Sequence, residues 1–507
     1  MTLTSFAFLF YVTLAIIIYY VIPQRLQWTA LLCYSAVFFA LSGNVTTGIY
    51  LLITWITTYV AGRGMAATEN ERYRKLWFTF GIGINLGILF LLKYLNFAIR
   101  NVNKVMIATG HSEIPFSTLL APIAISFYSL VCFGYLIEVY WGSIEPAQNF
   151  GKLGLFLFYF PQMTSGPITR YGQMEPQISG AHAFDSKNIT FGVERILWGM
   201  FKKLVVSARV SGWVHTLYYT PDTFHGLYYW LAAFLFMLYL YADFSGCMDI
   251  IMGVSECFGI MLPENFERPF FARSVQEYWQ KWHATLGAWL KDYILYPILR
   301  SKMFMNMGKK LRKAGYKHAA KRVPSYLGML CVWLLIGLWH GGDWKYILGM
   351  GMWFFGCIFL AQVLEPARKK LAEALHIKRD SLPWHVVQSL GVFVLVSIGN
   401  MFFYLDGIRH VLANLLDMFT TWNPGDFDGR FATTGATHQD IWLIVIFVLL
   451  QFAVSLYQEC KGSVRECVLS MPFIVRYVIW LGLFLGVFYF GKYGPNINLA
   501  DFIYRGF

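Results

Sequence analysis

The chain is poor in charged residues. Asp, Glu, Lys and Arg together make up 14% of its 507 residues, against about 25% in an ordinary soluble domain, while hydrophobic residues make up 57%. A helix that crosses a bilayer needs roughly 20 mostly apolar residues. Runs of this kind recur from end to end, which excludes a soluble enzyme and predicts an integral membrane protein with about ten to twelve spans. Clear examples are residues 6–22, 76–92, 327–339, 386–404, 441–456 and 473–490.

Several catalytic signatures are also missing. The eight cysteines have no metal-type pair spacing and suggest no disulfide framework, and the eleven histidines include no HExxH pattern. The chain has no Walker motif, no GxSxG elbow and no Rossmann fingerprint. We therefore expect no bound metal or cofactor, no ATP hydrolysis and no serine esterase chemistry. The first apolar run lacks the flanks of a removable signal peptide, and we expect it to remain as a membrane helix.

Positive charge is concentrated in short stretches. The formal net charge is +13, and no Asp or Glu occurs between Tyr293 and Gly342. Clusters of Lys and Arg mark cytoplasmic loops, so the acidic loop 406–440, the N-terminus and the C-terminal tail 491–507 are expected outside. The clusters expected inside are residues 63–75, 309–322, 368–379 and 461–465. Nucleic acid is a poor fit to clusters that lie between spans, whereas a nucleotide-bearing donor or anionic lipid headgroups remain candidate partners.

The segment FYFPQMTSGPITR, residues 158–170, interrupts an apolar region with two prolines and a glycine. Backbone breaks at membrane depth are tolerated only when they are buried in protein or line a cavity. The segment is therefore either a re-entrant element close to a site or an ordinary interfacial loop.

His340 ends an apolar run in LLIGLWHGGDWKYILGMGMW, with Trp339 before it and two glycines, Asp343 and Trp344 after it. An ionisable group in such a place is costly and indicates function by default. Imidazole suits general base catalysis near neutral pH, and the glycines allow close approach of another group. We interpret His340 as a catalytic base. The alternative is an inert, hydrogen-bonded histidine at the membrane interface.

His283 lies in the aromatic-rich segment EYWQKWHATLGAWLKDYILYP, which we expect at the cytoplasmic face. If that segment is one helix, Trp279, Trp282, His283 and Leu286 share a broad face. His283 is the second catalytic candidate. The alternative is a belt of interfacial aromatics, which accounts for the tryptophans better than for the histidine.

The stretch YLYADFSGCMDIIMG carries Asp243, Ser245 and Asp249 inside an apolar region. A spacing of six does not put the two carboxylates on one helical face, which argues against a paired-carboxylate site. They are expected to cap broken helices, line a polar channel or orient a histidine, and a structural role is favoured over direct catalysis.

Seven blocks of the sequence resemble, in the same order, motifs of the membrane-bound O-acyltransferase (MBOAT) family. The resemblance is to the bacterial branch that includes alginate O-acetyltransferase and the peptidoglycan O-acetylation membrane subunit, and it runs over nearly the whole chain. The blocks are PIAISFYSL at 122–130, YFPQMTSGPITRY at 159–171, GMFKKLVVSARV at 199–210, YADFSGCMDIIMG at 241–253, LPENFERPF at 262–270, WQKWHATLGAWLKDYILYP at 279–297 and GLWHGGDWKYILGMGMW at 337–353.

The resemblance implies one all-α polytopic membrane domain over residues 1–507, a ring of about ten to twelve tilted helices around a tunnel with re-entrant and interfacial helices. It implies that His340 is the family's essential histidine and His283 the second histidine of the WH motif. The channel for the substrates is expected to be lined by Trp339, Asp243, Ser245, Trp282, Asp343 and Trp344. The pair Ala284-Thr285 is a conservative departure from the family pattern.

The chain ends FIYRGF, residues 502–507, which resembles the aromatic hexapeptide that ends alginate-type members. In those systems the motif tyrosine is implicated as an acyl acceptor, so Tyr504 is the third catalytic candidate. The alternative is a tail anchored at the membrane interface by its aromatic residues.

For function, the resemblance implies an O-acyltransferase of the bacterial cytoplasmic membrane. It implies acetyl-CoA as the cytoplasmic donor, an extracellular or cell-wall polysaccharide as the final acceptor, and an extracytoplasmic SGNH/GDSL-type subunit as partner. D-alanyl transfer from a carrier protein to teichoic acid, a lipid O-acyltransferase and a transporter without bond chemistry remain alternatives.

Overall fold

The computed structural model describes residues 2–42, 44–122, 124–421 and 429–493. Throughout these residues the regular structure is helical, as expected where lipid offers backbone groups no hydrogen-bond partner; the one β contact is an isolated antiparallel bridge between Phe266 and Trp282. Eight described helices are long and apolar enough to cross a membrane, and two shorter apolar helices, Phe6–Val21 and Ile125–Trp141, accompany them. The chain is thus an all-α, multi-pass membrane protein, and the eight candidate spans of the described residues are fewer than the ten to twelve that the sequence predicts.

The first half of the chain contains these helices: α1 (Phe6–Val21), α2 (Gln27–Ser42), α3 (Gly48–Ala66), α4 (Glu71–Leu89), η3 (Phe90–Tyr94), α5 (Leu95–Ala108), α6 (Ile125–Trp141), α7 (Phe150–Phe158), α8 (Phe160–Met163), α9 (Tyr171–Ser179), α10 (Ser186–Met200), η4 (Phe201–Ser207), α11 (Ala208–Tyr219) and α12 (Leu227–Cys257).

The second half contains α13 (Val275–Lys281), α14 (Ala284–Leu290), η6 (Lys291–Leu295), α15 (Tyr296–Arg300), α16 (Lys302–Lys313), α17 (Lys317–His340), η7 (Lys345–Met350), α18 (Gly351–Val363), α19 (Glu365–Ala374), α20 (Leu382–Tyr404), α21 (Gly407–Thr420), α22 (His438–Lys461), α23 (Val464–Ser470) and α24 (Phe473–Phe490). The elements η3, η4, η6 and η7 are π-helical stretches.

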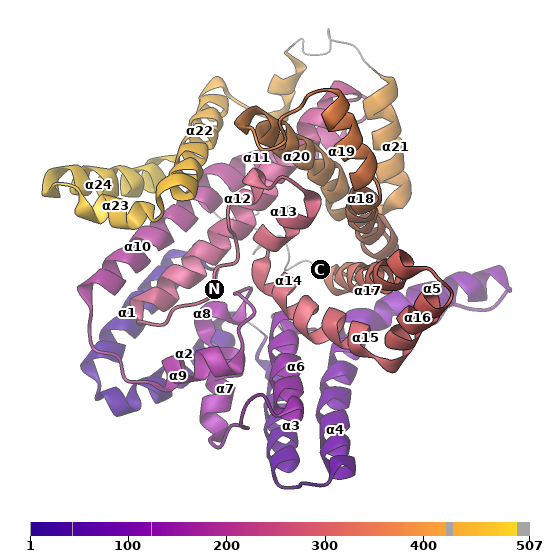
Figure 1. The fold of residues 1–507 in the computed structure, drawn as a ribbon. Helices are drawn as coiled ribbons and strands as arrows, with labels where there is room; N and C mark the ends of the chain where they lie inside the picture. Colours follow the sequence, from indigo (N-terminus) through magenta and orange to yellow (C-terminus); the bar gives the residue numbers. More distant parts are fainter. Residues whose placement is uncertain (1, 43, 123, 422–428, 494–507) are drawn as a thin grey trace.

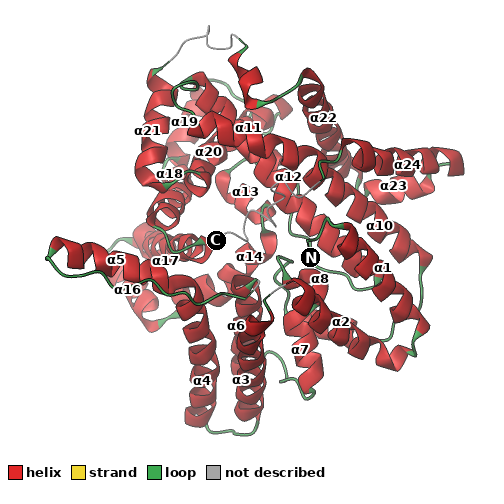
Figure 2. Cartoon of the chain, turned by 180° about the vertical axis from the view of Figure 1, so that it is seen from behind, coloured by secondary structure: helices red, strands yellow, loops and turns green. Residues whose placement is uncertain are grey.

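The helices surround a centre occupied by α14 and the end of α17. In both views α3, α4 and α6 lie on one side of α14, α10 and α12 on a second and α18 and α20 on a third (Figures 1 and 2). Residues near α14 therefore receive side chains from segments that are far apart in the sequence.

The pair α10 and α12 packs backbone against backbone. A Cβ placed on Gly199 would lie 2.5 Å from the carbonyl oxygen of Gly246, and one on Gly253 would lie 2.5 Å from that of Gly192. Two glycines seven residues apart on each helix thus allow a close crossing of the kind that small residues permit between membrane helices. As a result, α12 is the most deeply buried of the candidate spans.

The segment at 158–170 is broken as predicted. Helix α7 ends at Phe158, the one-turn helix α8 follows, and Ile168 and Thr169 are buried beyond it. A break enclosed by protein is the arrangement under which irregular backbone is tolerated at membrane depth. The segment therefore belongs to the protein interior rather than to a solvated loop.

The last three helices stand at the edge of the molecule (Figure 1). Of the 18 residues of α24, Val487 alone is buried, and α22 buries Ile444, Phe447 and Ser455. Their outward faces are apolar, as expected of helices that face lipid.

Candidate active site

His340 is the last residue of α17 and is 4% exposed. Its ring contacts three aromatic rings: Trp339 at a centroid distance of 4.9 Å, Phe403 of α20 at 5.4 Å and Tyr346 of η7 at 6.4 Å. The helix ends here because Gly341 turns the chain away with an extended backbone. An imidazole at the end of a span is thereby held among apolar rings and shielded from solvent.

The glycines beside His340 are required by close packing. A Cβ on Gly342 would lie 2.5 Å from Cβ of Phe97, and one on Gly337 would lie 2.4 Å from the carbonyl oxygen of Tyr346. The groups that approach these glycines are thus parts of the protein, which hold α5 and η7 against the end of α17.

His283 lies at a break between two helices. Helix α13 ends at Lys281, α14 begins at Ala284, and His283 between them has a left-handed backbone with φ of +48°. The interpretation of 279–289 as one continuous helix is therefore wrong, and Trp279, Trp282 and His283 do not share a helical face. The bridge from Trp282 to Phe266 explains the break, because it pulls Trp282 into an extended conformation.

The side chain of Asn265 holds His283 in place. Asn265 Oδ1 accepts hydrogen bonds from the backbone N–H of Thr285 at 3.2 Å and from its hydroxyl at 2.9 Å, and it lies 3.1 Å from Nδ1 of His283. His283 Nε2 is buried and has no hydrogen-bond partner among the residues that the structure describes. Sequence analysis missed Asn265, although it lies in the block LPENFERPF.

The two histidines meet on one indole. The Trp339 ring lies 4.9 Å from the His340 ring and 5.8 Å from the His283 ring. Phe127 of α6 is 5.5 Å from Trp339, and Phe244 of α12 is 4.9 Å from His283. The structure thus brings His340, His283 and Trp339 into one buried aromatic enclosure, built from helices that are distant in the sequence.

A lysine that the sequence analysis did not single out enters the same enclosure. Lys93 projects from the π-helical stretch η3, and its Nζ donates to the Trp339 carbonyl oxygen at 2.5 Å and to the Ser126 hydroxyl at 2.7 Å. Nζ also lies 5.6 Å from the centre of the Trp339 ring. The signal in the sequence was an ionisable residue inside the apolar run GILFLLKYL.

The two aspartates form ion pairs between α12 and the α10–η4 helix. Asp243 pairs with Lys203 at 2.5 Å, and Asp249 pairs with Lys202 and, at 3.0 Å, with Arg195. A structural role for both fits these contacts. Ser245 accepts a hydrogen bond from Lys202 at 2.9 Å.

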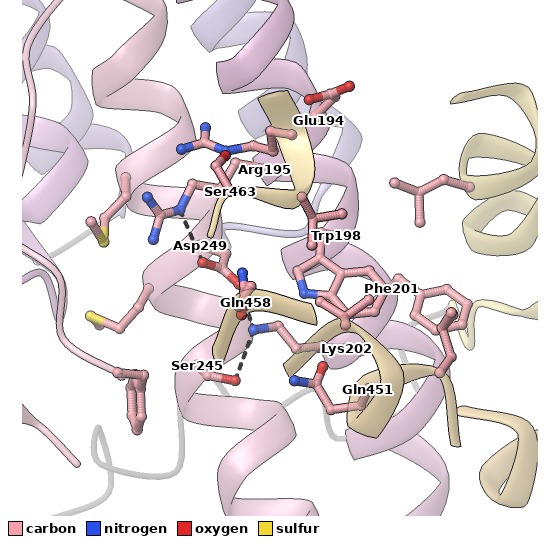
Figure 3. A pocket seen from close by; sticks show the side chains of 18 of the residues that line it. Glu194, Arg195, Trp198, Phe201, Lys202, Ser245, Asp249, Gln451, Gln458 and Ser463 are labelled. Atoms are coloured by element: carbon pink, nitrogen blue, oxygen red, sulfur yellow. Dashed lines mark hydrogen bonds and ion pairs between the residues drawn. The ribbon is translucent and has the colours of Figure 1, made fainter. Parts of the chain in front are cut away.

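A pocket of about 880 Å³ lies beside this ion-pair network, between α10, α12 and the last three helices (Figure 3). Asp249, Lys202 and Ser245 line it, with Gln451 and Trp480 from α22 and α24. Asn265 also lines the pocket, so the residue that bonds to His283 forms part of its wall.

The other predicted channel residues are placed differently. Trp282 is buried against Phe266 and Tyr278 with ring distances of 5.0 and 5.5 Å. Asp343 pairs with the exposed Arg100 at 3.4 Å and caps η7, and the half-exposed Trp344 donates to Asn101 at 2.8 Å. Tyr504 and the motif 502–507 lie outside the described residues.

Metal ligands are not grouped in the described part of the chain, where no cluster of three or more His, Cys, Asp or Glu is found. The enclosure contains two imidazoles, an ammonium group and an aromatic shell, a set suited to moving protons and stabilising charge.

The chain is similar in sequence to known proteins. The model of the membrane-bound O-acyltransferase family matches residues 149–311, a range that contains Asn265 and His283. A probable alginate O-acetylase of Pseudomonas putida is 27% identical over 467 residues, covering 89% of this chain and 87% of the relative. A peptidoglycan O-acetyltransferase of Helicobacter pylori is 26% identical over 340 residues, covering 62% and 60%. A teichoic acid D-alanyltransferase of Bacillus subtilis is 25% identical over 238 residues, covering 46% and 57%.

These similarities define a multi-pass membrane enzyme that transfers acyl groups to oxygen. The chain resembles the membrane-bound O-acyltransferase family over residues 149–311, and it is similar to bacterial members of that family over a longer range.

Proposed function

We propose that the protein takes an acetyl group from cytoplasmic acetyl-CoA and passes it across the bacterial cytoplasmic membrane for O-acetylation of an extracellular or cell-wall polysaccharide. The observation that carries the proposal is the burial of His340 and His283 against the single indole of Trp339. Two imidazoles inside an aromatic enclosure are suited to deprotonating a hydroxyl where water does not compete.

His340 is the general base in this proposal, and His283 assists it. A thioester is already an activated acyl donor, so the enzyme has to orient the reactants and remove one proton. A positioned base contributes roughly 10²–10⁴-fold to such a step, and orientation contributes further. Among the channel residues, Trp339 and Trp282 shape the enclosure, while Asp243 and Ser245 line the neighbouring polar region.

Acetyl is favoured over D-alanyl because the similarity to an alginate O-acetylase extends over most of both chains, whereas that to the D-alanyltransferase covers less than half of this one. The acceptor class follows from the names of the alginate and peptidoglycan relatives.

Delivery outside requires a carrier, because coenzyme A is large and highly charged. In our proposal, Tyr504 in the C-terminal tail accepts the acetyl group first, and an extracytoplasmic SGNH/GDSL-type subunit takes it from Tyr504 to the polysaccharide. Because the proposed partner has its own active site, this chain is required only to form and present the acyl ester.

The decisive experiment is acetyl transfer in proteoliposomes loaded on one side with radiolabelled acetyl-CoA. Wild-type protein should become labelled, whereas His340→Ala protein, reconstituted to the same level, should not. An aminoacylated carrier protein offered in place of acetyl-CoA tests the D-alanyl alternative. If His340→Ala protein supports normal acetylation of the polysaccharide, the chain is a transporter rather than the transferase.

A further inference from the structure

Lys93 lies where the two candidate histidines meet. It extends from η3, a five-residue π-helical stretch between α4 and α5, and such stretches often mark functional positions in helices. Its ammonium group binds the carbonyl oxygen of Trp339, the residue that precedes His340. The second hydrogen-bond partner of the ammonium group is the hydroxyl of Ser126, at the start of α6.

The ammonium group of Lys93 has no carboxylate partner among the described residues. All of its polar contacts are to neutral oxygens. A charge in the membrane interior without a counterion is costly, and groups of this kind are usually retained for function. A partly buried ammonium group without a carboxylate partner among the described residues is thus the feature of Lys93 that requires an explanation.

The three buried lysines among the described residues differ from Lys93 in this respect. Lys202 pairs with Asp249 and Lys203 with Asp243. Lys345, which donates to the carbonyl oxygen of Leu405 at 2.9 Å, feels the negative charges of Asp406 and Asp343. The positive charge of each of these lysines is therefore offset by a nearby carboxylate. The charge of Lys93, at the candidate active site, is not.

A purely structural role for Lys93 is the main alternative. The carbonyl oxygen of Trp339 is at the C-terminal end of α17, where a cation satisfies the last carbonyl groups and interacts favourably with the helix dipole. A neutral donor would satisfy that carbonyl group as well. The helix dipole stabilises a cation here by at most about 2 kcal/mol, less than the several kcal/mol that an unpaired charge loses away from water. The helix end therefore accounts for the hydrogen-bond donor and for only part of the positive charge.

We propose that Lys93 is a catalytic residue: its ammonium group stabilises the negative charge that develops on the acyl carbonyl oxygen during transfer. The inference rests on the proposed function, since it requires an acyl thioester to react beside His340. It adds an electrostatic group to the base, so that charge arising in the transition state meets a cation already in place.

The step balances as follows. The acceptor hydroxyl oxygen bonds to the thioester carbonyl carbon while its proton passes to His340, and the carbonyl π electrons move to oxygen. Lys93 stabilises the resulting oxyanion. When the oxygen lone pair re-forms the carbonyl double bond, the carbon–sulfur bond breaks, and the sulfur takes the proton from His340. The products are an oxygen ester and a free thiol, with His340 and Lys93 back in their starting states.

The expected size of the effect follows from the environment. Charge interactions are much stronger in a water-excluded site than in solvent, and loss of one donor that stabilises an oxyanion typically costs about 10²–10³-fold in kcat. Because the charge appears only in the transition state, KM for the donor should change little.

Lys93→Gln separates the two roles of the side chain. Glutamine keeps an N–H donor for the Trp339 carbonyl group and removes the charge. We expect kcat for acetyl transfer in proteoliposomes to fall about 10²–10³-fold, with KM for acetyl-CoA and the thermal unfolding midpoint near the wild-type values. Lys93→Arg, which keeps the charge, should retain at least tenfold more activity than Lys93→Gln.

Lys345→Gln is the matched control, since Lys345 is also a largely buried amine on a backbone carbonyl oxygen. It should keep kcat within about threefold. Wild-type kcat in Lys93→Gln protein, or an equal loss of kcat in Lys345→Gln protein, would overturn the inference.

If Lys93→Gln protein does not fold, the inference is tested on the wild-type enzyme by ligand binding. A coenzyme A analogue with an anionic tetrahedral centre should bind more tightly than a neutral ketone analogue. Equal binding of the two analogues would reject the inference.

Failure of the inference can be told apart from failure of the proposed function. An inactive His340→Ala protein together with a fully active Lys93→Gln protein rejects Lys93 alone. An active His340→Ala protein rejects the base on which both depend.

Discussion

The Nδ1 atom of His283 lies 3.1 Å from Oδ1 of Asn265, and this contact determines which nitrogen of the ring carries the proton. The backbone N–H of Thr285 donates to the same oxygen, so the amide of Asn265 is oriented with its oxygen toward His283. Since a carbonyl oxygen can only accept, Nδ1 of His283 must be the protonated nitrogen. Nε2 is then the acceptor, and none of the described residues donates a hydrogen bond to it.

Asn265→Leu should therefore impair transfer through His283. It removes the acceptor that selects the tautomer and orients the ring, and we expect kcat to fall roughly 10- to 100-fold, the equivalent of one or two buried hydrogen bonds. Asn265→Asp retains the acceptor and should restore much of the activity. It should also shift the pH profile of kcat, because a carboxylate stabilises the imidazolium form of His283. Equal losses in both variants, with no shift of the profile, would reduce Asn265 to a packing residue.

His340→Ala should fold, reach the membrane and lose acyl transfer by about 10²–10⁴-fold. His283→Ala should be impaired but retain part of the activity, since His283 assists rather than removes the proton. Labelling from radioactive acetyl-CoA in proteoliposomes measures both, at matched protein levels. A larger loss of acyl transfer in His283→Ala than in His340→Ala would make His283 the general base and His340 the assisting residue.

The orientation in the membrane is tested by labelling introduced cysteines. Arg312 at the end of α16 is exposed and is expected in the cytoplasm, whereas Thr433 is exposed in the loop 406–440 that is expected outside. In intact cells, with the exposed Cys33 and Cys460 replaced by serine, an impermeant maleimide should react with Thr433→Cys protein and spare Arg312→Cys protein. The opposite labelling pattern would mean that the topology is reversed. It would also contradict the use of cytoplasmic acetyl-CoA, because the face assigned to the donor would then lie outside.

Tyr504→Phe tests the acyl carrier. Phenylalanine keeps nearly all the apolar surface of the tail and removes only the hydroxyl group, so the protein should assemble normally and stop polysaccharide acetylation. A phenol has an ordinary pKa near 10, so it needs a base such as His340 in order to attack. Mass spectrometry of the tail peptide should show an acetyl group on wild-type Tyr504 that is absent from His340→Ala protein. Full polysaccharide acetylation by Tyr504→Phe protein would leave the tail as an anchor.

The sequence was sufficient to identify a multi-pass helical membrane protein, and it singled out His340 and His283, whose catalytic role stays a prediction. Both signals are local. Apolar runs show the spans, and a histidine next to tryptophan within a family block stands out. The backbone break at His283 was not predictable in the same way. It depends on the bridge between Phe266 and Trp282, which is a tertiary contact, whereas the 3.6-residue spacing of the segment favoured one helix.

Lys93 and Asn265 were missed for a related reason. Each is a single polar residue whose role arises only when η3, α14 and α17 converge, and no spacing rule connects them to His340. The separation of Asp343 and Trp344 from the enclosure has the same origin. They follow His340 closely in the chain, but the turn at Gly341 directs them toward Arg100 and Asn101.

The buried pair of Lys203 and Asp243 yields the last prediction. Both side chains are 5% exposed, and the pair joins η4 to α12 at 2.5 Å. Removing one member of a buried ion pair leaves the other charge uncompensated and typically costs about 3–5 kcal/mol, whereas replacing both by apolar residues of similar size is often neutral. Lys203→Met should therefore lower the thermal unfolding midpoint in detergent markedly, and Lys203→Met combined with Asp243→Leu should recover most of the loss.

If the double variant retains stability but transfers acetyl poorly, Asp243 contributes to the channel as well as to the fold. If the double variant is as unstable as the single one, the pair itself is a net source of stability, and the ion pairs between α12 and η4 help to hold the helices around the active site.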